Sequence, residues 1–429
     1  MNELETPPLA LIERNVQERA KQASLDLDGA EGETALRRMI DGEIAQWQDD
    51  HRRGARSVPL SHPEQVAERT FRNIARYGPL TTLLDDDDVW EIMINSPASI
   101  FVKRHSRPAG YHDEVFLDDD HVLRTLTRLL DRSSTAHRKL DPAEGLQDAQ
   151  LDDGARLHIV HGDLARGGHI MVNIRKFTGM STIQSLDELV ALGTVSPDAA
   201  RFLSACVAAR RTIVFAGVPG SGKTTLLNCC AAELDPSLRV VIAEEVFEAD
   251  LPLPNVASMQ TRAPRADRAG IDLRRLVAGF LRMAPDIAIV GEVRDREALP
   301  LLLTLSSGVK GFTTIHAGSA RQALTRLRFV CQLADSGAQI PLSALNTLVS
   351  EAIDIVVHTD RGPDGPRVMS ILAVEDLAGG AEAVQFTATD VFERGPDGTL
   401  VWTGQVPVRL ADPLGRIGCD ISALLRGDR

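Results

Sequence analysis

The sequence predicts an α/β protein in which an N-terminal helical segment and a smaller α+β domain precede the main parallel sheet. Three observations point to this class. Short apolar runs alternate with helical segments over residues 181–366, a pattern typical of an open, mostly parallel sheet flanked by helices. Strand-like alternation appears in residues 63–180 and returns from residue 367 onward as a β appendage. A chain of 429 residues is also too long for one simple core, so several domains are expected.

The overall composition restricts the classes of function. A net charge of −13 and only 4% aromatic residues disfavour a nucleic-acid groove, so no direct nucleic-acid partner is expected. The five cysteines are scattered without a Cys-x-x-Cys spacing, which suggests reduced thiols in the cytoplasm. The start lacks a signal-peptide pattern and no apolar run approaches the ~18 residues of a membrane span, so any membrane role is expected to come through partners.

Residues 1–62 are polar and rich in charge. Helical patterns cover Leu9–Ala23 and Thr34–Gln48, and the stretch Asp49–Pro59 follows them as a linker. Two interpretations stay open for this segment, a mobile tail or a docking module for a partner. Sequence alone does not separate a solvated helix from one that docks.

Residues 63–180 alternate between helix and strand signals. A helix from about Pro63 ends near Gly78, because Gly followed by Pro after an apolar-periodic stretch stops a helix. The other expected elements are a hairpin of Val89–Asn95 with Ile100–Arg104, a helix over His121–Asp131, and strands over Arg156–Val160 and Ile170–Phe177. Together these elements predict a compact α+β domain.

The main sheet is expected in residues 181–366. Ser196 and Pro197 suit the N-cap and the first turn of a helix. The predicted strands are Thr212–Ala216, Arg239–Ala243, Asp286–Glu292 and Gly311–His316, with a helix over Leu273–Met283. In residues 367–429 strands are expected at Val368–Val374, Ala383–Thr389 and Leu400–Val408, with a hairpin-type turn at Asp397-Gly398.

The stretch Gly217–Thr225 reads Gly-x4-Gly-Lys-Thr, the phosphate-binding P-loop pattern. Glycines let backbone N–H groups surround an anion, and the following helix N-terminus adds partial positive charge. Lys223 can neutralise the outer phosphates and the Thr224 hydroxyl can bind Mg2+. An ordinary glycine-rich turn is the alternative, and it fits less well because every fixed position of the motif is filled. The residues expected to bind the nucleotide here are Gly217, Pro219, Gly220, Ser221, Gly222, Lys223, Thr224 and Thr225.

Polar residues follow the other predicted strands at their carboxyl ends, where open parallel sheets place their chemistry. Glu292 is expected to orient Mg2+ or an attacking water; the alternative is an exposed acid at a strand end. Glu244 and Glu248 belong to an acidic cluster that can position water or a metal, and the alternative is an acidic helix start. His316 can sense the terminal phosphate, although an isolated histidine is more often structural.

Phosphoryl transfer also needs positive charge against the transferred oxygens. Spacing alone does not distinguish among the candidates, which are Arg156, Arg175, Arg262, Arg282 and Arg294.

In these motifs the chain resembles the secretion and pilus traffic ATPases of the type II/type IV secretion superfamily. Within it, the chain is most similar to the CpaF-like tight-adherence (Tad/Flp) pilus assembly branch. The resemblance covers about residues 65–395. It rests on the stretches Tyr77–Leu84, Val89–Asn95, Ile174–Phe177, Gly217–Thr225, Glu244–Glu248, Leu281–Arg294, Gly311–Ser319 and Ala323–Leu327.

The resemblance implies an ATPase that uses ATP and Mg2+ and forms a hexameric ring. Each subunit would pair an N-terminal domain with a RecA-like ATPase domain and bind ATP between them. The implied partners are further copies of the chain and the platform proteins of an inner membrane. The implied location is cytoplasmic, peripheral at the inner face of that membrane.

The resemblance also implies roles for single residues. Glu244 and Glu248 would belong to an acidic box, Glu292 would be the Walker B acid that binds the metal with Thr224, and His316 would belong to a histidine box. Glu248 or Glu292 would activate water. By the same resemblance, arginines that contact the nucleotide would be Arg156 and Arg175 from the N-terminal domain and Arg262 after the acidic box.

One position departs from the family pattern: Glu245 stands where the family usually has Asp, which puts its role in doubt. The tetracysteine insert of some type II secretion members is absent, so no zinc is expected. The expected function is a hydrolytic motor for a Tad/Flp-type pilus. The alternatives are a type IV secretion or conjugation ATPase, and a nucleotide-dependent assembly scaffold that hydrolyses little.

Overall fold

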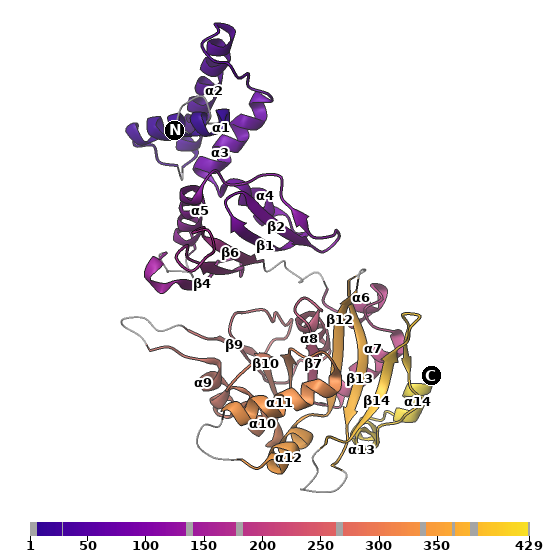
Figure 1. Cartoon of the computed structure of the whole chain (residues 1–429). Coiled ribbons are helices and arrows are strands. Elements are labelled where there is room, and N and C mark those ends of the chain that lie inside the picture. Colours follow the sequence, from indigo (N-terminus) through magenta and orange to yellow (C-terminus); the bar gives the residue numbers. More distant parts are fainter. Residues whose placement is uncertain are drawn as a thin grey trace. The chain divides into compact units, whose positions relative to one another are not determined.

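The computed structural model of the chain describes residues 7–27, 29–133, 140–176, 183–262, 269–334, 340–362, 365–377 and 385–427. The chain forms two compact units, Met1–Gly179 and Met180–Arg429, which we call unit 1 and unit 2 (Figure 1). Each unit has hydrophobic cores of its own, and each is described by itself below.

Three helices open unit 1: α1 (Pro8–Gln22), α2 (Ala30–Arg52) and α3 (Pro63–Ala75). The helices predicted near residues 9–23 and 34–48 are therefore confirmed. Apolar residues at helical spacing face inward from all three helices. Their shared core contains Ile12, Val16, Leu36, Ile40, Trp47, Phe71 and Ile74. The first two helices thus pack with α3 as a small bundle.

A six-stranded antiparallel sheet forms the rest of unit 1, in the order β3-β2-β1-β6-β5-β4. Its strands are β1 (Val89–Ser96), β2 (Ser99–Arg104), β3 (Gly110–Tyr111), β4 (Leu146–Gln150), β5 (Arg156–Val160) and β6 (Met171–Arg175). The accompanying helices are the 3-10 turns η1 (Gly78–Leu80) and η2 (Pro142–Glu144), α4 (Thr81–Asp85) and α5 (Asp119–Asp131). The predicted β1–β2 hairpin and the helix over 121–131 are confirmed.

Unit 2 is built on a nine-stranded sheet in the order β15-β14-β13-β12-β7-β11-β10-β8-β9. The six strands from β12 to β9 run parallel, as the alternation of strands and helices predicts. They are β7 (Ile213–Gly217), β8 (Val240–Glu244), β9 (Val256–Gln260), β10 (Ile287–Val293), β11 (Lys310–Ile315) and β12 (Ile355–Gly362). The α/β fold class is therefore confirmed.

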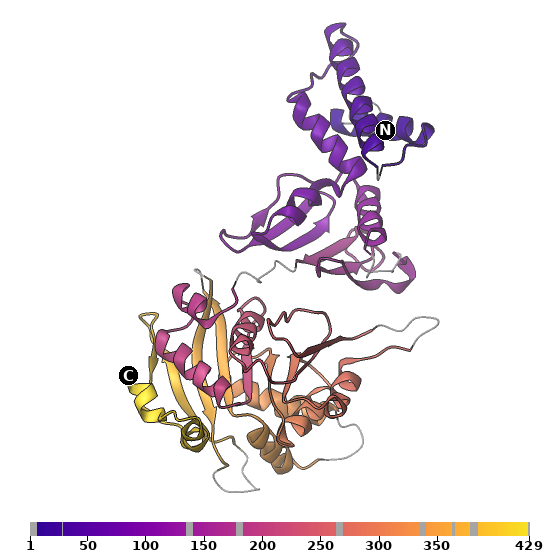
Figure 2. The same cartoon turned by 180° about the vertical axis from the view of Figure 1, so that it is seen from behind.

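Helices cover both faces of this sheet, because successive strand side chains point to opposite sides. In β8, Ile242 joins one core and Ala243 the other. The first core includes α6 (Leu186–Ala191), α7 (Pro197–Ala208) and α8 (Lys223–Ala232). The second lies under α9 (Leu273–Ala278), α10 (Ala298–Ser306), α11 (Ala320–Ala334) and α12 (Leu342–Ala352), in front of the sheet in Figure 1. Figure 2 shows the opposite face, with the pink helix near residue 200 in front.

The C-terminal strands extend the same sheet with antiparallel pairing. They are β13 (Gly365–Val374), β14 (Ala388–Arg394) and β15 (Leu400–Trp402), followed by α13 (Val408–Arg416) and α14 (Ile421–Arg426). The strand predicted over residues 400–408 is wrong beyond Trp402. Gly404 takes a left-handed φ of 86° that ends the strand, and Pro407 directly precedes α13. Residues 383 and 384 of the strand predicted over 383–389 lie outside the described residues. The rest of that prediction is wrong up to residue 387, because β14 begins only at Ala388.

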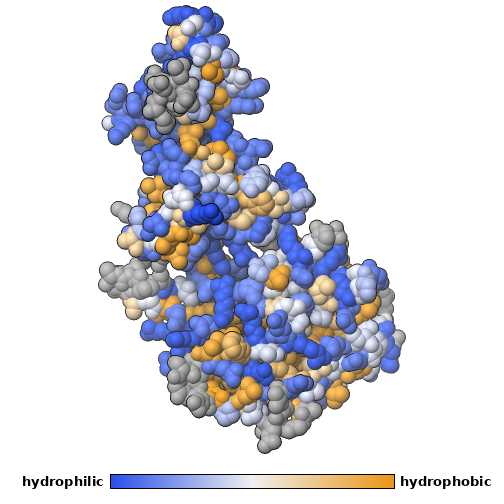
Figure 3. Space-filling view, in the orientation of Figure 1, coloured by the Kyte–Doolittle hydropathy of each residue, from blue (hydrophilic) through white to orange (hydrophobic). Residues whose placement is uncertain are grey.

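The surface of unit 2 carries an apolar patch over α10 and α11 (Figure 3). Its most exposed large side chains are Leu303, Phe329 and Leu333, each more than half exposed. Among the described residues, no helix combines the length and the hydropathy needed to cross a membrane.

Candidate phosphate-binding and hydrolytic site

The P-loop joins the end of β7 to the start of α8. Gly222 is the N-cap of α8, so Lys223, Thr224 and Thr225 form the first turn of the helix. The N–H groups of a helix's first turn have no carbonyl partner within the helix, and such groups commonly bind anions. The structure therefore places the predicted phosphate-binding loop in the strand–loop–helix context that its function requires.

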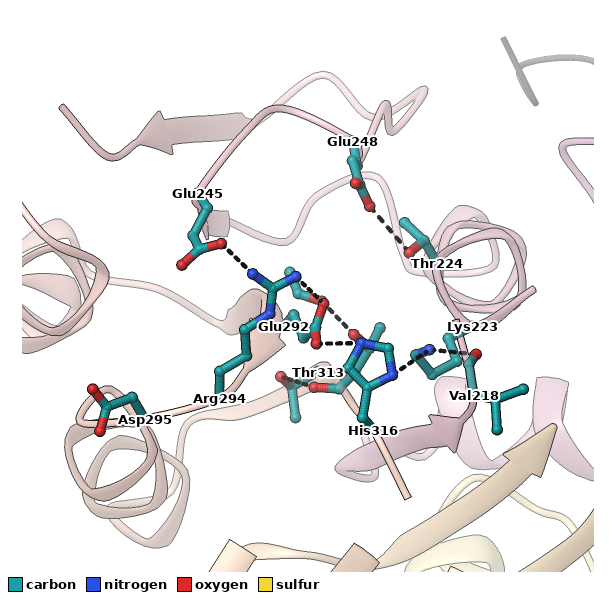
Figure 4. Close-up of polar contacts among 12 residues, drawn as sticks. Val218, Lys223, Thr224, Glu245, Glu248, Glu292, Arg294, Asp295, Thr313 and His316 are labelled. Carbon is teal, nitrogen blue, oxygen red and sulfur yellow. Dashed lines mark hydrogen bonds and ion pairs between the residues drawn. The ribbon is translucent and has the colours of Figure 1, made fainter. Parts of the chain in front are cut away.

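The side chain of Lys223 is folded into this loop and is only 7% exposed as a residue. Its Nζ donates hydrogen bonds to the carbonyl oxygens of Gly217 at 3.2 Å and Val218 at 2.9 Å. It also lies 3.3 Å from Nδ1 of His316, at the end of β11 (Figure 4). The lysine is therefore held at the mouth of the loop by neutral acceptors and an imidazole.

The carboxylate of Glu292, near the end of β10, connects to this lysine through His316. Nε2 of His316 lies 2.8 Å from Oε1 of Glu292, and Nη2 of Arg294 lies 2.8 Å from Oε2 (Figure 4). Burial by itself would raise the pKa of Glu292, but the hydrogen bonds from His316 and Arg294 outweigh it and lower the pKa to about 2. Glu292 is consequently ionised at neutral pH.

Arg294 bridges two acids. Its Nη1 lies 2.6 Å from Oε2 of Glu245, while Nη2 binds Glu292. The hydrogen bond to Glu292 is the main reason that the pKa of Arg294 is raised above its ordinary value. Glu245, the residue that departs from the family pattern, therefore has a partner in the site, and its side chain reaches the arginine beside Glu292.

Glu244 and Glu248 occupy a different part of the site. Glu244 is buried at the end of β8, and its Oε1 accepts hydrogen bonds from the backbone N–H of Glu248 at 3.1 Å and of Ala249 at 3.0 Å. Gly291 of the neighbouring strand β10 makes room for it: a Cβ on residue 291 would lie 2.9 Å from Cγ of Glu244. Glu244 therefore shapes the segment that carries Glu248.

Glu248 faces the P-loop helix. The hydroxyl of Thr224 lies 3.3 Å from Oε2 of Glu248 (Figure 4). With the carboxylate of Glu292, the site thus offers a hydroxyl and two carboxylates from three different sheet-end segments. Oxygen ligands of this kind suit Mg2+, which usually keeps several of its own waters, so these residues fit the expected metal.

The predicted arginines are placed differently. Arg156 of β5 and Arg175 of β6 are cross-strand partners in the sheet of unit 1. Arg262 forms an isolated bridge with Ile271 and donates from Nη2 to the carbonyl oxygen of Ala269 at 3.1 Å. The structure thus brings Arg156 and Arg175 together, while the guanidinium of Arg262 bonds to a segment of its own loop.

Sequence reasoning did not single out Arg294 as the partner of Glu292 and Glu245. A usable signal was present, because residues two apart in a strand point to the same side. Glu292 lies in β10 and Arg294 directly follows the last residue of that strand, so the two have this spacing. The contact with Glu245 depends on the pairing of β10 with β8, which no local pattern indicates.

The chain is similar to known proteins over the region that contains these site residues. A family model described as "Type II/IV secretion system protein" matches residues 74–358. The probable conjugal transfer protein TrbB of Sinorhizobium fredii is 28% identical over 345 residues, covering 76% of this chain and 94% of that protein. The type IV secretion system protein PtlH homolog of Bordetella bronchiseptica is 33% identical over 303 residues, covering 65% and 87%.

A solved structure with similarity is the VirB11 ATPase from the Brucella suis type IV secretion system in complex with sulphate. It shares 28% identity, and the match covers 68% of this chain and 94% of that chain with a TM-score of 0.37. The family match spans the P-loop, Glu244–Glu248, Glu292 and His316, all of which the structure gathers at one edge of the sheet. The chain belongs to the type II/IV secretion system protein family.

Proposed function

We propose that the chain is an ATP-hydrolysing motor of a type II/IV secretion machine. The observation that carries the proposal is the continuous line of contacts from Lys223 through His316 to Glu292. This line joins a phosphate-binding lysine to an ionised acid at the neighbouring strand ends. A binding module that only held nucleotide would not need such a connection.

When ATP binds, Lys223 would give up its hydrogen bonds to loop carbonyl oxygens and bind phosphate oxygens instead. Its ammonium now donates to the carbonyl oxygens of Gly217 and Val218, which are neutral acceptors. Phosphate oxygens are charged and accept stronger hydrogen bonds, so they would draw Nζ away from the loop carbonyls. His316 contacts both Lys223 and the Gly217 carbonyl oxygen, at 3.2 Å from Nδ1, and would sense this exchange. The movement of the lysine would thus be passed to Glu292.

Glu292 and Glu248 would have different roles in hydrolysis. A general base should have a pKa near the working pH, and the pKa of about 2 makes Glu292 a poor proton acceptor. Its permanent charge instead suits it to hold Mg2+ together with Thr224, where the ion would neutralise charge on the phosphate oxygens. Glu248, beside the Thr224 hydroxyl, is then the candidate that orients and deprotonates water.

We propose that Arg156 and Arg175 bind the phosphates of the nucleotide. Arg156 and Arg175 are cross-strand partners on β5 and β6, so two guanidinium side chains come from adjacent strands. Guanidinium groups bind phosphate oxygens through strong, charge-assisted hydrogen bonds. Assembly as a hexamer, use of Mg2+ and docking on an inner-membrane platform complete the proposal, and these points rest on the family resemblance.

Two machines remain candidates for this motor. The motif resemblance favours assembly of a Tad/Flp-type pilus. The conjugal transfer and type IV secretion names of the relatives at 28% and 33% identity favour the second candidate, a type IV secretion or conjugation ATPase. Deletion of the gene separates them: loss of surface pili with unchanged DNA or effector transfer indicates the first, and the reverse indicates the second.

The hydrolytic function is tested by release of phosphate from ATP by the full-length protein. Lys223→Ala removes the charge that neutralises the phosphates, and we expect turnover to fall by roughly 100-fold or more. Arg201→Ala, an exposed arginine of α7 paired with Asp198, is a matched control and should hydrolyse ATP normally. Unchanged phosphate release by Lys223→Ala would refute the proposal.

A further inference from the structure

The hairpin formed by β12 and β13 lies against the P-loop on the side away from Glu292. Thr359 of β12 is buried, and its hydroxyl donates a hydrogen bond to the carbonyl oxygen of Ala216 at 3.1 Å. The hydroxyl of Ser221 lies 2.9 Å from the same oxygen atom of Thr359. A threonine hydroxyl has one hydrogen, which is donated to Ala216, so Ser221 is the donor in the second bond. Thr359 therefore links the start of the loop to its middle.

Arg361 makes a second contact two residues further along β12. Its Nη1 donates to the carbonyl oxygen of Gly220 at 3.1 Å. The hairpin register places Arg361 opposite Pro366 of β13, and a Cβ on Gly222 would lie 2.9 Å from Cβ of that proline. The hairpin thus touches the loop at Gly220, Ser221 and Gly222, just before the first turn of α8.

The two sides of the loop differ in what nucleotide binding would do to them. Lys223 and His316 contact the Gly217 carbonyl oxygen from the hydrolytic side, and Lys223 must leave it to reach phosphate. The bonds from Thr359 and Arg361 go to atoms that need not move. A carbonyl group that is held by a donor outside the site leaves the loop N–H groups free to converge on an anion.

We propose that Thr359 and Arg361 are positioning residues that hold the P-loop in its phosphate-receptive conformation and so set the affinity for nucleotide. The inference rests on the proposed function, because it assumes that the loop binds ATP. Neither residue lies in a sequence motif, and both lie just beyond residues 74–358, which match the family model. A loop that is already shaped for its ligand binds more tightly because less ordering remains to be done on binding.

The test uses two loss variants, one rescue variant and one control, all in the full-length protein. Thr359→Val keeps the shape of the side chain but removes the hydroxyl, and Arg361→Ala removes the guanidinium. Thr359→Ser restores a hydroxyl and should restore binding. Arg367→Ala is the control on the same hairpin, because its Nη1 donates to the carbonyl oxygen of Gly193, away from the P-loop.

We expect Thr359→Val and Arg361→Ala each to raise the Kd for a fluorescent ATP analogue and the KM for ATP by roughly 10-fold. kcat should change by less than about 3-fold, since the bonds described above join these side chains to the P-loop backbone and Ser221. The melting temperatures of Arg361→Ala and Arg367→Ala should agree. If Thr359→Val fails to fold, the half-buried Arg361 still decides the question through Arg361→Ala.

Normal affinity in folded Arg361→Ala, or a fall in kcat at unchanged KM, would overturn the inference. Failure of the wild-type protein to bind the ATP analogue would instead contradict the proposed function. A wild-type protein that binds ATP, with variants that bind it equally well, would leave the proposed function intact and remove only the positioning role.

Discussion

Two buried or half-buried glutamates, one in each unit, show how differently the same side chain can behave. Glu292 of unit 2 lies at a strand end with its side chain 21% exposed, between His316 and Arg294, and its pKa is lowered to about 2. Glu13 of α1 in unit 1 is 2% exposed, and burial raises its pKa above the ordinary value despite a hydrogen bond from Asn73. Charged partners decide the first case and desolvation decides the second.

The two glutamates lie in regions that use charged groups differently. The carboxyl ends of parallel strands bring charged groups together at one edge of the sheet, where His316 and Arg294 keep Glu292 ionised. In unit 1 the contact between α1, α3 and α5 buries Glu13, Asn73 and His121, and each is at most 3% exposed. Polar groups in that contact affect stability and are far less suited to hydrolysis.

Replacing Glu292 should produce the largest effect. Glu292→Gln removes the charge that pairs with Arg294 and His316 while keeping the side-chain size, and we expect ATP turnover to fall by roughly 100-fold or more. Binding of the ATP analogue should persist, because the P-loop is unchanged. Glu393→Gln on the exposed side of β14 is the control. Normal turnover in Glu292→Gln would show that the strand-end acid is structural.

A fall in pH tests the effect of burial on the pKa of a side chain in unit 1, and His121 is the residue to follow. Burial lowers the pKa of this imidazole to about 4 from its ordinary 6.5. As the pH falls, His121 therefore takes up a proton in the unfolded chain before it does so in the folded chain. The contribution of neutral His121 to the free energy of unfolding is fully present above pH 6.5 and is lost as the pH falls towards 4. The loss is roughly 3 kcal/mol, at about 1.4 kcal/mol per pKa unit.

His121→Gln should remove this pH dependence from α5 and its neighbours. The measurement is amide hydrogen exchange of unit 1 in the full-length protein between pH 7 and pH 4, corrected for intrinsic exchange rates. The exposed His158, replaced by Gln, serves as control. Equal loss of protection in the wild type and in His121→Gln would mean that another group controls the acid response.

The smallest effect is expected for Glu13→Gln. Because the folded-state pKa of Glu13 is raised, its stabilising contribution is present below pH 4.5 and is lost as the pH rises through the folded value. The amide should therefore stabilise the bundle at pH 7 and change little at pH 4. Glu18→Gln, exposed on the same helix, should be neutral at both. Destabilisation by Glu13→Gln at pH 7 would show that the pairing of Glu13 with Arg124 outweighs burial.

Much of the candidate site could be predicted because parallel strands end at one edge of a sheet. Lys223, Glu292 and His316 follow apolar strands in the sequence, and adjacent strands bring them together. The contribution of Thr359 could not be predicted, since it depends on the pairing of β12 with β7, strands separated by more than a hundred residues. The buried contact of Glu13 with Asn73 has the same cause, because it joins two helices whose separate patterns look merely amphipathic.

The close approach at Gly291 has a consequence for how the site could be altered. The side chain of Glu244 passes over Gly291, where a methyl group would lie 2.9 Å from its Cγ. Glu244 in turn holds the backbone of Glu248. Because Gly291 of β10 has no side chain, the side chain of Glu244 on β8 has room to pack beside it. A single added methyl group there would displace Glu244 and, through it, the backbone of Glu248, the residue proposed to activate water.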